Sequence, residues 1–149
     1  YGDHRDLHSF PTRRSSDLFM GVRVKSIDTQ KCEVTLPYSW WSQNPFKSIY
    51  FAAQAAAAEL STGALAMMAL QGQPPVSMLV SDLKGEFIKK ATQKTTFTCT
   101  DTHKIFEAIA QTLRTGEGTT ATIESIGTQE DGVVVSRFSF TWSFKAKKQ

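Results

Sequence analysis

Apolar and polar residues alternate along much of the chain, and this period of two predicts β-strands. The first two such runs cover 22–27 and 32–36, with a short polar turn at 28–30 between them. Pro37 ends the second run, because proline cannot donate a hydrogen bond within a sheet. The pattern therefore predicts an antiparallel strand pair at the start of the fold.

Four more strands are predicted in the second half of the chain. A break at 71–75, which contains glycine and two prolines, precedes a long strand over 76–90. We expect this strand to bend near Gly85, since glycine inside a strand often marks a bend or a bulge. Three shorter alternating runs follow, at 95–100, 119–128 and 133–144.

Between the second and third of these strands the periodicity becomes helical. Asp101 and Thr102 offer side-chain oxygens for an N-cap, and Gly116 suits the C-terminal end of a helix. We therefore predict a short amphipathic helix with one apolar face. That face consists of Ile105, Phe106, Ile109 and Leu113.

A second, longer helix is predicted near the middle of the chain. An aromatic and polar connection over 38–43 leads into 44–63, which reads NPFKSIYFAAQAAAAELSTG. Alanine is the best helix former, so this stretch should be helical and should continue to Leu70. Because few of its side chains are strongly polar, it lacks the polar face of a surface helix. We expect a central helix enclosed on most sides, with small side chains that let a sheet approach closely.

Glu59 stands in the middle of this apolar stretch. A buried carboxylate is costly unless it is paired, so its presence calls for a partner, a cleft or a purpose. A glutamate at an exposed helix edge is the plainer alternative. A membrane span is rejected, because a central carboxylate costs about 2.5–3.5 kcal/mol on insertion and the later segments alternate as strands.

These elements define a fold class. Most connections between the predicted strands are too short for parallel crossovers, so the sheet should be antiparallel. We predict an α+β domain in which one curved antiparallel sheet wraps around one long central helix. The short second helix is inserted between strands.

Residues 1–18, YGDHRDLHSFPTRRSSDL, resemble the in-frame translation of a sequencing adapter. We exclude them from the fold, as one would exclude an expression tag, and expect His4 and His8 to have no function. The alternative, a natural disordered basic arm, is disfavoured by the length of the match. We expect one domain over 19–145, a solvated tail at 146–149, and a native chain that begins further upstream.

The excluded segment contains three basic and three acidic residues, so the net charge of the rest is still +3. This mild basicity without clustered arginine gives no case for nucleic acid, although it suits an anionic small ligand. Cys32 and Cys99 lie in alternating apolar runs, which predicts buried free thiols in a reducing cytoplasm. No cysteine or histidine spacing suggests a metal, and we expect no cofactor.

The chain from about 19 to 145 resembles the hotdog-fold acyl-CoA thioesterases, in an uncharacterised branch near the phenylacetate-pathway-type enzymes. Asn44 matches the loop asparagine of that family, and Ser48 matches the small hydroxyl residue after its usual glycine. Glu59 matches the acid of the central helix, and Gly63 matches the small residue one turn beyond it. The resemblance implies a hotdog fold and thioester hydrolysis.

Two further features of the sequence bear on this resemblance. The stretch DLKGEFIKKA at 82–91 is similar to the long strand of the family and the basic turn that ends it. Lys47, however, stands where the family usually has glycine, and the loop carries no histidine. Both departures bear on whether a backbone amide of the loop can bind an oxyanion.

The resemblance implies a reaction centred on Glu59, as a base toward water or as a nucleophile on the thioester carbonyl. Backbone N–H groups at the helix start near Ser48 would stabilise the oxyanion, while Asn44 would orient water or the carbonyl. A catalytic triad is disfavoured, because His103 is the only histidine outside the excluded segment and is far in sequence from Glu59. The expected substrate-binding residues are Lys47, Gln54, Thr62 and Gly63.

Three alternatives remain open at this point. For Gln54 a packed structural role is an equal alternative, since five residues from Glu59 is not a same-face interval. Lys47 favours a non-catalytic module that binds an acyl group or acyl-CoA. A dehydratase or hydratase on the same fold is disfavoured by the absent loop histidine.

The expected substrate is an acyl-CoA or an acyl-carrier thioester, with neither nucleic acid nor a membrane span involved. The strand at 76–90 should form a long apolar edge that needs cover. We therefore expect a homodimer or a tetramer, in which two such edges pair across a twofold axis and bring each Glu59 near the loop of the partner.

Overall fold

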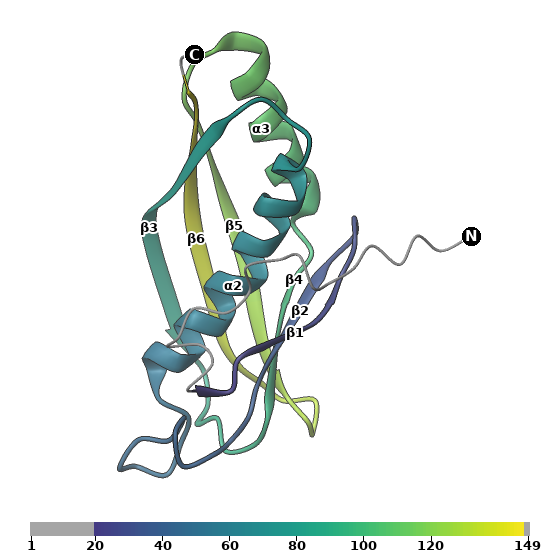
Figure 1. Ribbon diagram of the computed structural model, residues 1–149. Helices are drawn as coiled ribbons and strands as arrows, with labels where there is room; N and C mark the ends of the chain where they lie inside the picture. The colour runs from purple at the N-terminus through teal and green to yellow at the C-terminus, as the bar shows by residue number, and fades with distance from the viewer. Residues whose placement is uncertain (1–19, 148–149) are drawn as a thin grey trace, which may run out of the picture.

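The computed structural model describes residues 20–147; the adapter-like segment and the end of the tail lie outside this range. All strand pairs are antiparallel and form one sheet with the order β1-β2-β4-β5-β6-β3. Helix α2 lies against this sheet and contacts β2, β4 and β5, while α3 packs beside α2 and β5 (Figure 1). This architecture confirms the predicted α+β hotdog fold. The elements are β1 (Arg23–Ile27), β2 (Cys32–Leu36), α2 (Phe51–Leu70), β3 (Val76–Phe87), β4 (Thr95–Cys99), α3 (Thr102–Thr115), β5 (Thr119–Gln129) and β6 (Val134–Ala146).

The side of α2 that faces the sheet is lined by small residues, as the alanine run predicts. Ala53, Ala57 and Ala58 are fully buried, and the large side chains that fill the space come from the sheet. Gly63 is one such close approach, because a Cβ atom there would lie 3.2 Å from the Trp142 ring. Small side chains on the helix thus make room for aromatic side chains on the strands.

Polar contacts add to this packing and tie α2 to β5 and β6. The hydroxyls of Ser61 and Ser125 lie 2.7 Å apart in the core. The Ser136 hydroxyl donates to Gln54 Oε1 at 2.8 Å. These bonds pair buried polar groups that would otherwise be costly to remove from water.

Strand β3 differs from the prediction in two respects. It ends at Phe87 rather than near residue 90. The irregularity in its pairing lies between Val80 and Asp82, whereas Gly85 keeps its register opposite Phe138. The predicted bend near Gly85 is therefore wrong, and the irregularity of the strand lies about four residues earlier. Gly85 provides packing space instead, because a Cβ atom there would lie 3.0 Å from the Phe138 ring.

Helix α3 forms where predicted, although its start and one face differ in detail. The Asp101 side chain does not cap the helix. Its Oδ2 atom accepts hydrogen bonds from the Glu124 backbone N–H at 2.9 Å and from Lys104 Nζ at 3.1 Å. Phe106 remains 40% exposed, so the predicted apolar face is narrower than expected. Gly116 closes the helix in the left-handed conformation, as predicted.

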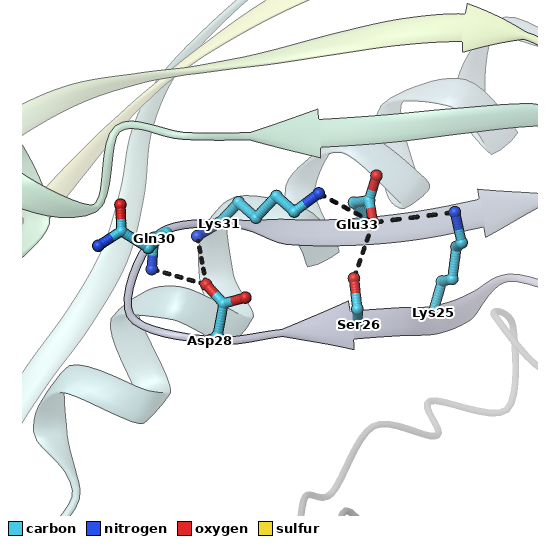
Figure 2. A network of polar contacts seen from close by, with 6 residues as sticks. All are labelled: Lys25, Ser26, Asp28, Gln30, Lys31 and Glu33. Carbon is cyan, nitrogen blue, oxygen red and sulfur yellow. Dashed lines mark hydrogen bonds and ion pairs between the residues drawn. The ribbon is translucent and has the colours of Figure 1, made fainter. Parts of the chain in front are cut away.

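The turn between β1 and β2 is held by carboxylates (Figure 2). Asp28 Oδ1 accepts from the backbone N–H groups of Gln30 and Lys31 at 2.7 and 2.9 Å, which lowers the pKa of Asp28. Glu33 Oε2 accepts from the Ser26 hydroxyl at 2.8 Å, and this bond is the main cause of the lowered pKa of Glu33. The hairpin is therefore stabilised locally, far from the end of the sheet where α2 begins.

Cys32 and Cys99 face each other in register on β2 and β4, and both are buried and free, as predicted. Burial raises the pKa of Cys32 to about 12 and that of Cys99 to about 11. At neutral pH both thiols are therefore protonated and act as small apolar side chains.

Candidate functional site

The loop that leads into α2 is organised around Asn44. Its Oδ1 atom accepts from the backbone N–H groups of Phe46 and Ser48 at 3.0 and 3.3 Å, and from the Ser48 hydroxyl at 3.2 Å. Since backbone N–H groups can only donate, the carbonyl end of the amide must point into the loop. Among the described residues nothing accepts a hydrogen bond from Asn44 Nδ2, so this end can donate to a ligand.

Lys47 takes a backbone conformation that glycine usually supplies. Its φ angle is 56°, and among residues 20–147 it is the only residue other than glycine with a positive φ. The Lys47 N–H donates to the Asn44 carbonyl at 3.0 Å, and its own carbonyl accepts from the Tyr38 hydroxyl at 3.1 Å. The loop therefore keeps a glycine-type turn although lysine occupies the position.

The oxyanion donors expected near Ser48 are not found at that residue. Ser48 is buried, and its backbone N–H and hydroxyl both donate to Asn44. Helix α2 begins at Phe51, after Tyr50 as N-cap, and no side chain caps it. The first helical N–H groups have no intrahelical acceptor, and they carry the positive end of the helix dipole. The donors suited to an oxyanion are thus the first N–H groups of α2.

A cleft of about 330 Å³ opens in front of the loop and the first turn of α2. The loop contributes Asn44 and Ser48, and the opposite wall is the segment that follows β3. The backbone holds the two walls together, because the Ile49 N–H donates to the Ala91 carbonyl at 2.8 Å. The lining residues are Asn44, Ser48, Ile49, Phe51, Gln54, Phe87, Ile88, Lys89, Lys90 and Ala91.

Seven of these ten lining residues were not predicted from the sequence, which gave only Asn44, Ser48 and Gln54. Ile88, Lys89 and Lys90 lie outside helices and strands, so no periodic pattern marks them. Phe51 is an apolar residue in an apolar stretch, so nothing in the sequence separates it from the buried residues that follow. The only signal for this wall was the similarity of 82–91 to a basic turn. Both lysines are exposed, so the cleft has a positively charged rim.

Glu59 lies on α2 but does not line this cleft. It is half-buried and follows Phe51 by eight residues. At 1.5 Å per residue this places it about 12 Å further along the helix axis. Within one chain, therefore, Asn44 and Glu59 belong to different parts of the surface.

The other predicted site residues on α2 face the sheet. Gln54 is buried, and its Nε2 atom donates to the Ile49 carbonyl at 3.1 Å while Oε1 accepts from Ser136. The hydroxyl of Thr62 donates to the Glu59 carbonyl at 2.9 Å and accepts from Trp142 Nε1 at 3.0 Å. Gly63 lies against the same tryptophan. These contacts give all three residues a structural role in positioning α2.

One edge of the sheet lies open beside the site. Strand β3 forms that edge, and Leu83 and Phe87 are each about half exposed although they face the same side of the sheet as Phe138 and Phe140. The residues of α2 that the sheet does not bury recur at helical spacing. In the first half of α2 they are Phe51, Ala52, Ala55, Ala56, Glu59 and Leu60. Glu59 is therefore part of a mostly apolar strip of α2 that the described part of the chain buries only in part.

The described residues form neither a metal site nor a membrane-spanning helix. Within residues 20–147 no three side chains of histidine, cysteine, aspartate or glutamate gather closely enough to hold a metal ion. None of the described helices has the length and apolar character needed to cross a membrane.

The fold has known relatives. A protein of unknown function from Pseudomonas aeruginosa, described as a probable thioesterase, is 18% identical, with 91% of this chain and 94% of that chain covered and a TM-score of 0.75. A thioesterase from Haemophilus influenzae is 13% identical, with 89% and 84% covered and a TM-score of 0.69. A protein of unknown function from Chlorobaculum tepidum is 13% identical, with 88% and 86% covered and a TM-score of 0.76. At these identities the likeness shows a shared fold.

The sequence comparisons agree with this assignment. A family model described as a domain of unknown function (DUF4442) matches residues 18–144. None of the curated proteins matches the chain in sequence.

Proposed function

The chain belongs to the DUF4442 family, a domain of unknown function, and this description names no activity. From the geometry of the candidate site we propose that the protein hydrolyses acyl-CoA thioesters. The observation that carries this proposal is a carboxylate on the alanine-rich helix together with a loop whose donors face a cleft at the start of that helix. Two relatives of the same fold are described as thioesterases, which supports this reaction class.

The proposed roles are assigned to the carboxylate on α2 and to the donors beside the cleft. As a base, Glu59 takes a proton from water while the water oxygen bonds to the thioester carbonyl; the C–S bond then breaks and the thiolate receives that proton, which gives a carboxylic acid and a thiol. As a nucleophile, Glu59 bonds to the carbonyl and the thiolate leaves and is protonated, and water then hydrolyses the resulting anhydride to release the acid and regenerate Glu59. Asn44 Nδ2 and the first N–H groups of α2 donate to the developing oxyanion. Ser48 acts through Asn44, because its backbone N–H and hydroxyl fix the orientation of the amide.

A complete site requires a second chain in this proposal. Along the helix axis Glu59 lies about 12 Å beyond Phe51 and about 7.5 Å beyond Gln54, the two residues of α2 that line the cleft of the same chain. Pairing two β3 edges across a twofold axis would cover the exposed Leu83 and Phe87 and would place Glu59 near the cleft of the partner subunit. We therefore propose a homodimer with two shared sites, acting in a reducing cytoplasm on acyl-CoA or an acyl-carrier thioester.

The conformation of Lys47 bears on the alternative of a binding protein without turnover. Loss of the family glycine would favour that alternative if it had altered the loop. Lys47 instead keeps the left-handed conformation, so the Asn44 carbonyl and amide retain their bonds across the turn. This supports hydrolysis over binding alone.

The test compares hydrolysis of acyl-CoAs of graded chain length by wild type and Glu59→Gln, with free thiol release as the readout. The amide is nearly isosteric, so the fold should be kept while turnover falls by at least ~10²-fold. Glu107→Gln, an exposed glutamate on α3, is the matched control and should hydrolyse at the wild-type rate. Equal rates for Glu59→Gln and wild type would remove Glu59 from the mechanism.

A second variant tests the loop. Asn44→Asp keeps an oxygen for the Phe46 and Ser48 N–H groups but replaces the Nδ2 donor by a carboxylate oxygen. We expect unchanged melting and turnover reduced by at least ~10²-fold, as for removal of one oxyanion donor. Binding of acyl-CoA by a wild type that releases no thiol would establish the binding-protein alternative.

A further inference from the structure

The loop before α2 holds large aromatic side chains in the solvent. Trp40 is 83% exposed and Phe46 is 74% exposed. Removing such side chains from water is favourable, so their exposure in a folded chain indicates a partner that covers them. Neither side chain lines the cleft at the start of α2, so that cleft does not explain their exposure.

The loop presents these side chains on a fixed backbone. The Ser42 hydroxyl donates to the Pro37 carbonyl at 2.6 Å and accepts from the Ser39 N–H at 2.9 Å. The Tyr50 N–H closes the loop by donating to the Ser42 carbonyl at 2.7 Å. Because the polar groups of the loop bond to each other, Trp40 and Phe46 are displayed outward instead of folding back onto the core.

The loop projects from the end of the molecule at which α2 begins (Figure 1). There it lies beside the segment after β3, through the Ile49 N–H and the Ala91 carbonyl. That segment adds the exposed apolar side chain of Ile88. We call this surface the aromatic end; it consists of Trp40, Phe46, Lys47, Ile88, Lys89 and Lys90.

The charge of the aromatic end has one sign. The segments 34–58 and 87–100, which form it, contain lysines but no aspartate or glutamate. Acidic residues border these segments at Glu33, Glu59, Glu86 and Asp101, and Asp131 on the turn after β5 accepts from Gln93 and Gln129 at 3.4 Å, but none of them belongs to the aromatic end. Lys47, Lys89 and Lys90 are exposed among the aromatic and aliphatic side chains.

From this combination we propose that the aromatic end docks on an anionic phospholipid surface. Aromatic side chains, tryptophan above all, favour the headgroup level of a bilayer, where the ring contacts lipid while its polar edge stays in contact with water. Lysines at that level pair with lipid phosphates, each favouring an anionic bilayer by about fivefold. A protein partner would have to supply a pocket for each ring, whereas a bilayer surface accepts projecting rings and neighbouring lysines such as Phe46 and Lys47 together. Docking is peripheral and does not depend on the proposed hydrolysis.

The experiment measures binding of the full chain to vesicles by cosedimentation, with phosphatidylcholine alone or with about 30 mol% phosphatidylglycerol. We expect at least about tenfold tighter binding to the anionic vesicles, weakened by salt because surface charges are screened. Brominated lipid should quench the tryptophan emission of the wild type. The double variant Lys89→Gln/Lys90→Gln should lose most of the preference for anionic vesicles.

Matched variants separate the aromatic end from other exposed rings. Trp40→Ser and Phe46→Ser should each weaken binding about tenfold or more, since the side chain carries the apolar contact. Phe106→Ser removes an exposed ring from α3 and should bind as the wild type does. Wild type that ignores both vesicles, or serine variants that bind equally well, would overturn the proposal. Self-association that is lost in the serine variants, without vesicle binding, would assign the surface to a second copy and would also overturn it.

Discussion

Lys47 shows how one residue can change while the backbone around it stays the same. Its left-handed φ of 56° places the Cβ atom of an ordinary residue close to the following carbonyl, which costs about 1–2 kcal/mol. The turn persists because three backbone bonds around it are made, from Lys47 to Asn44, from Asn44 to Ser48 and from Ile49 to Ala91. The strain at this position is therefore balanced by the loop as a whole.

A direct prediction follows for this position. Lys47→Gly should raise the free energy of unfolding by about 0.5–1 kcal/mol, the relief of left-handed strain less the backbone entropy of glycine. The melting temperature should rise by about 2–4 °C. Lys104→Gly, in the first turn of α3, is the control and should lower it, because glycine is a poor helix former. A melting temperature that falls in Lys47→Gly would show that the lysine side chain itself holds the loop.

Individual site residues were predictable to the extent that their chemistry shows in the sequence. Asn44 was singled out because it matches the loop asparagine of the thioesterase family, whereas the hydrogen bonds that its Oδ1 atom accepts from the Phe46 and Ser48 N–H groups were not predicted. The roles of Gln54 and Thr62 could not be read from spacing along the helix. Which face of α2 meets Ser136 and Trp142 depends on sheet packing, and no local pattern encodes it.

The helix α2 is held to the sheet differently from a typical amphipathic helix. Its buried side consists largely of alanine, which offers little apolar area to bury. Buried hydrogen bonds therefore carry more of the positioning, from Gln54 near its start to Ser61 and Thr62 in its middle. Because Glu59 lies between Gln54 and Ser61 on α2, the same contacts fix its position relative to the sheet.

The bond between β6 and Gln54 can be tested on its own. Ser136→Ala removes the donor and leaves Gln54 Oε1 buried without a partner, which should cost about 1–3 kcal/mol. The melting temperature should fall while the double variant Ser136→Ala/Gln54→Leu, which removes both polar groups, should recover part of the loss. Ser139→Ala, on the opposite face of β6, is the control and should melt close to the wild type. Additive losses in the double variant would contradict a direct interaction.

At the level of elements most of the fold could be predicted, because strands and helices follow local periodicity. Strand β6 alternates strictly from Phe138 to Phe144, and α3 ends at a glycine. The predictions that were wrong concern features that depend on contacts with other elements of the fold. Asp101 leaves its capping role because the Glu124 N–H of β5 lies within reach. The irregularity of β3 lies at Val80 because β6 sets its register, a contact that lies 60 residues away in the chain.

Within residues 20–147 one long edge of the sheet has no strand paired to it. Strand β3 has 12 residues and pairs only with β6 among the described strands. An open edge with half-exposed Leu83 and Phe87 is a template for another strand. The proposed pairing of two such edges would account at once for the edge, for the partly exposed strip of α2 and for the separation of Glu59 from the cleft.

The dimer can be tested with one substitution on each face of this strand. Leu83→Lys places a charge on the side of β3 that faces the helix layer, where the second subunit would pack. Light scattering at micromolar concentration should show a dimer for wild type and a monomer for Leu83→Lys, which should also lose hydrolysis. Leu79→Lys makes the same change opposite Ser143, on the outer face of the same strand, and should remain a dimer. A monomeric wild type would contradict the shared site.

Mixing two inactive variants tests whether the sites are shared between subunits. If Glu59 acts in the cleft of its partner, a heterodimer of Glu59→Gln and Asn44→Asp contains one site with both changes and one intact site. Random exchange at equal concentrations should then restore about a quarter of the wild-type rate, because half of the dimers carry one good site out of two. Sites built within single chains would each carry one change, so the mixture would stay inactive. Leu83→Lys in both variants should abolish the restoration, since exchange then gives no dimer.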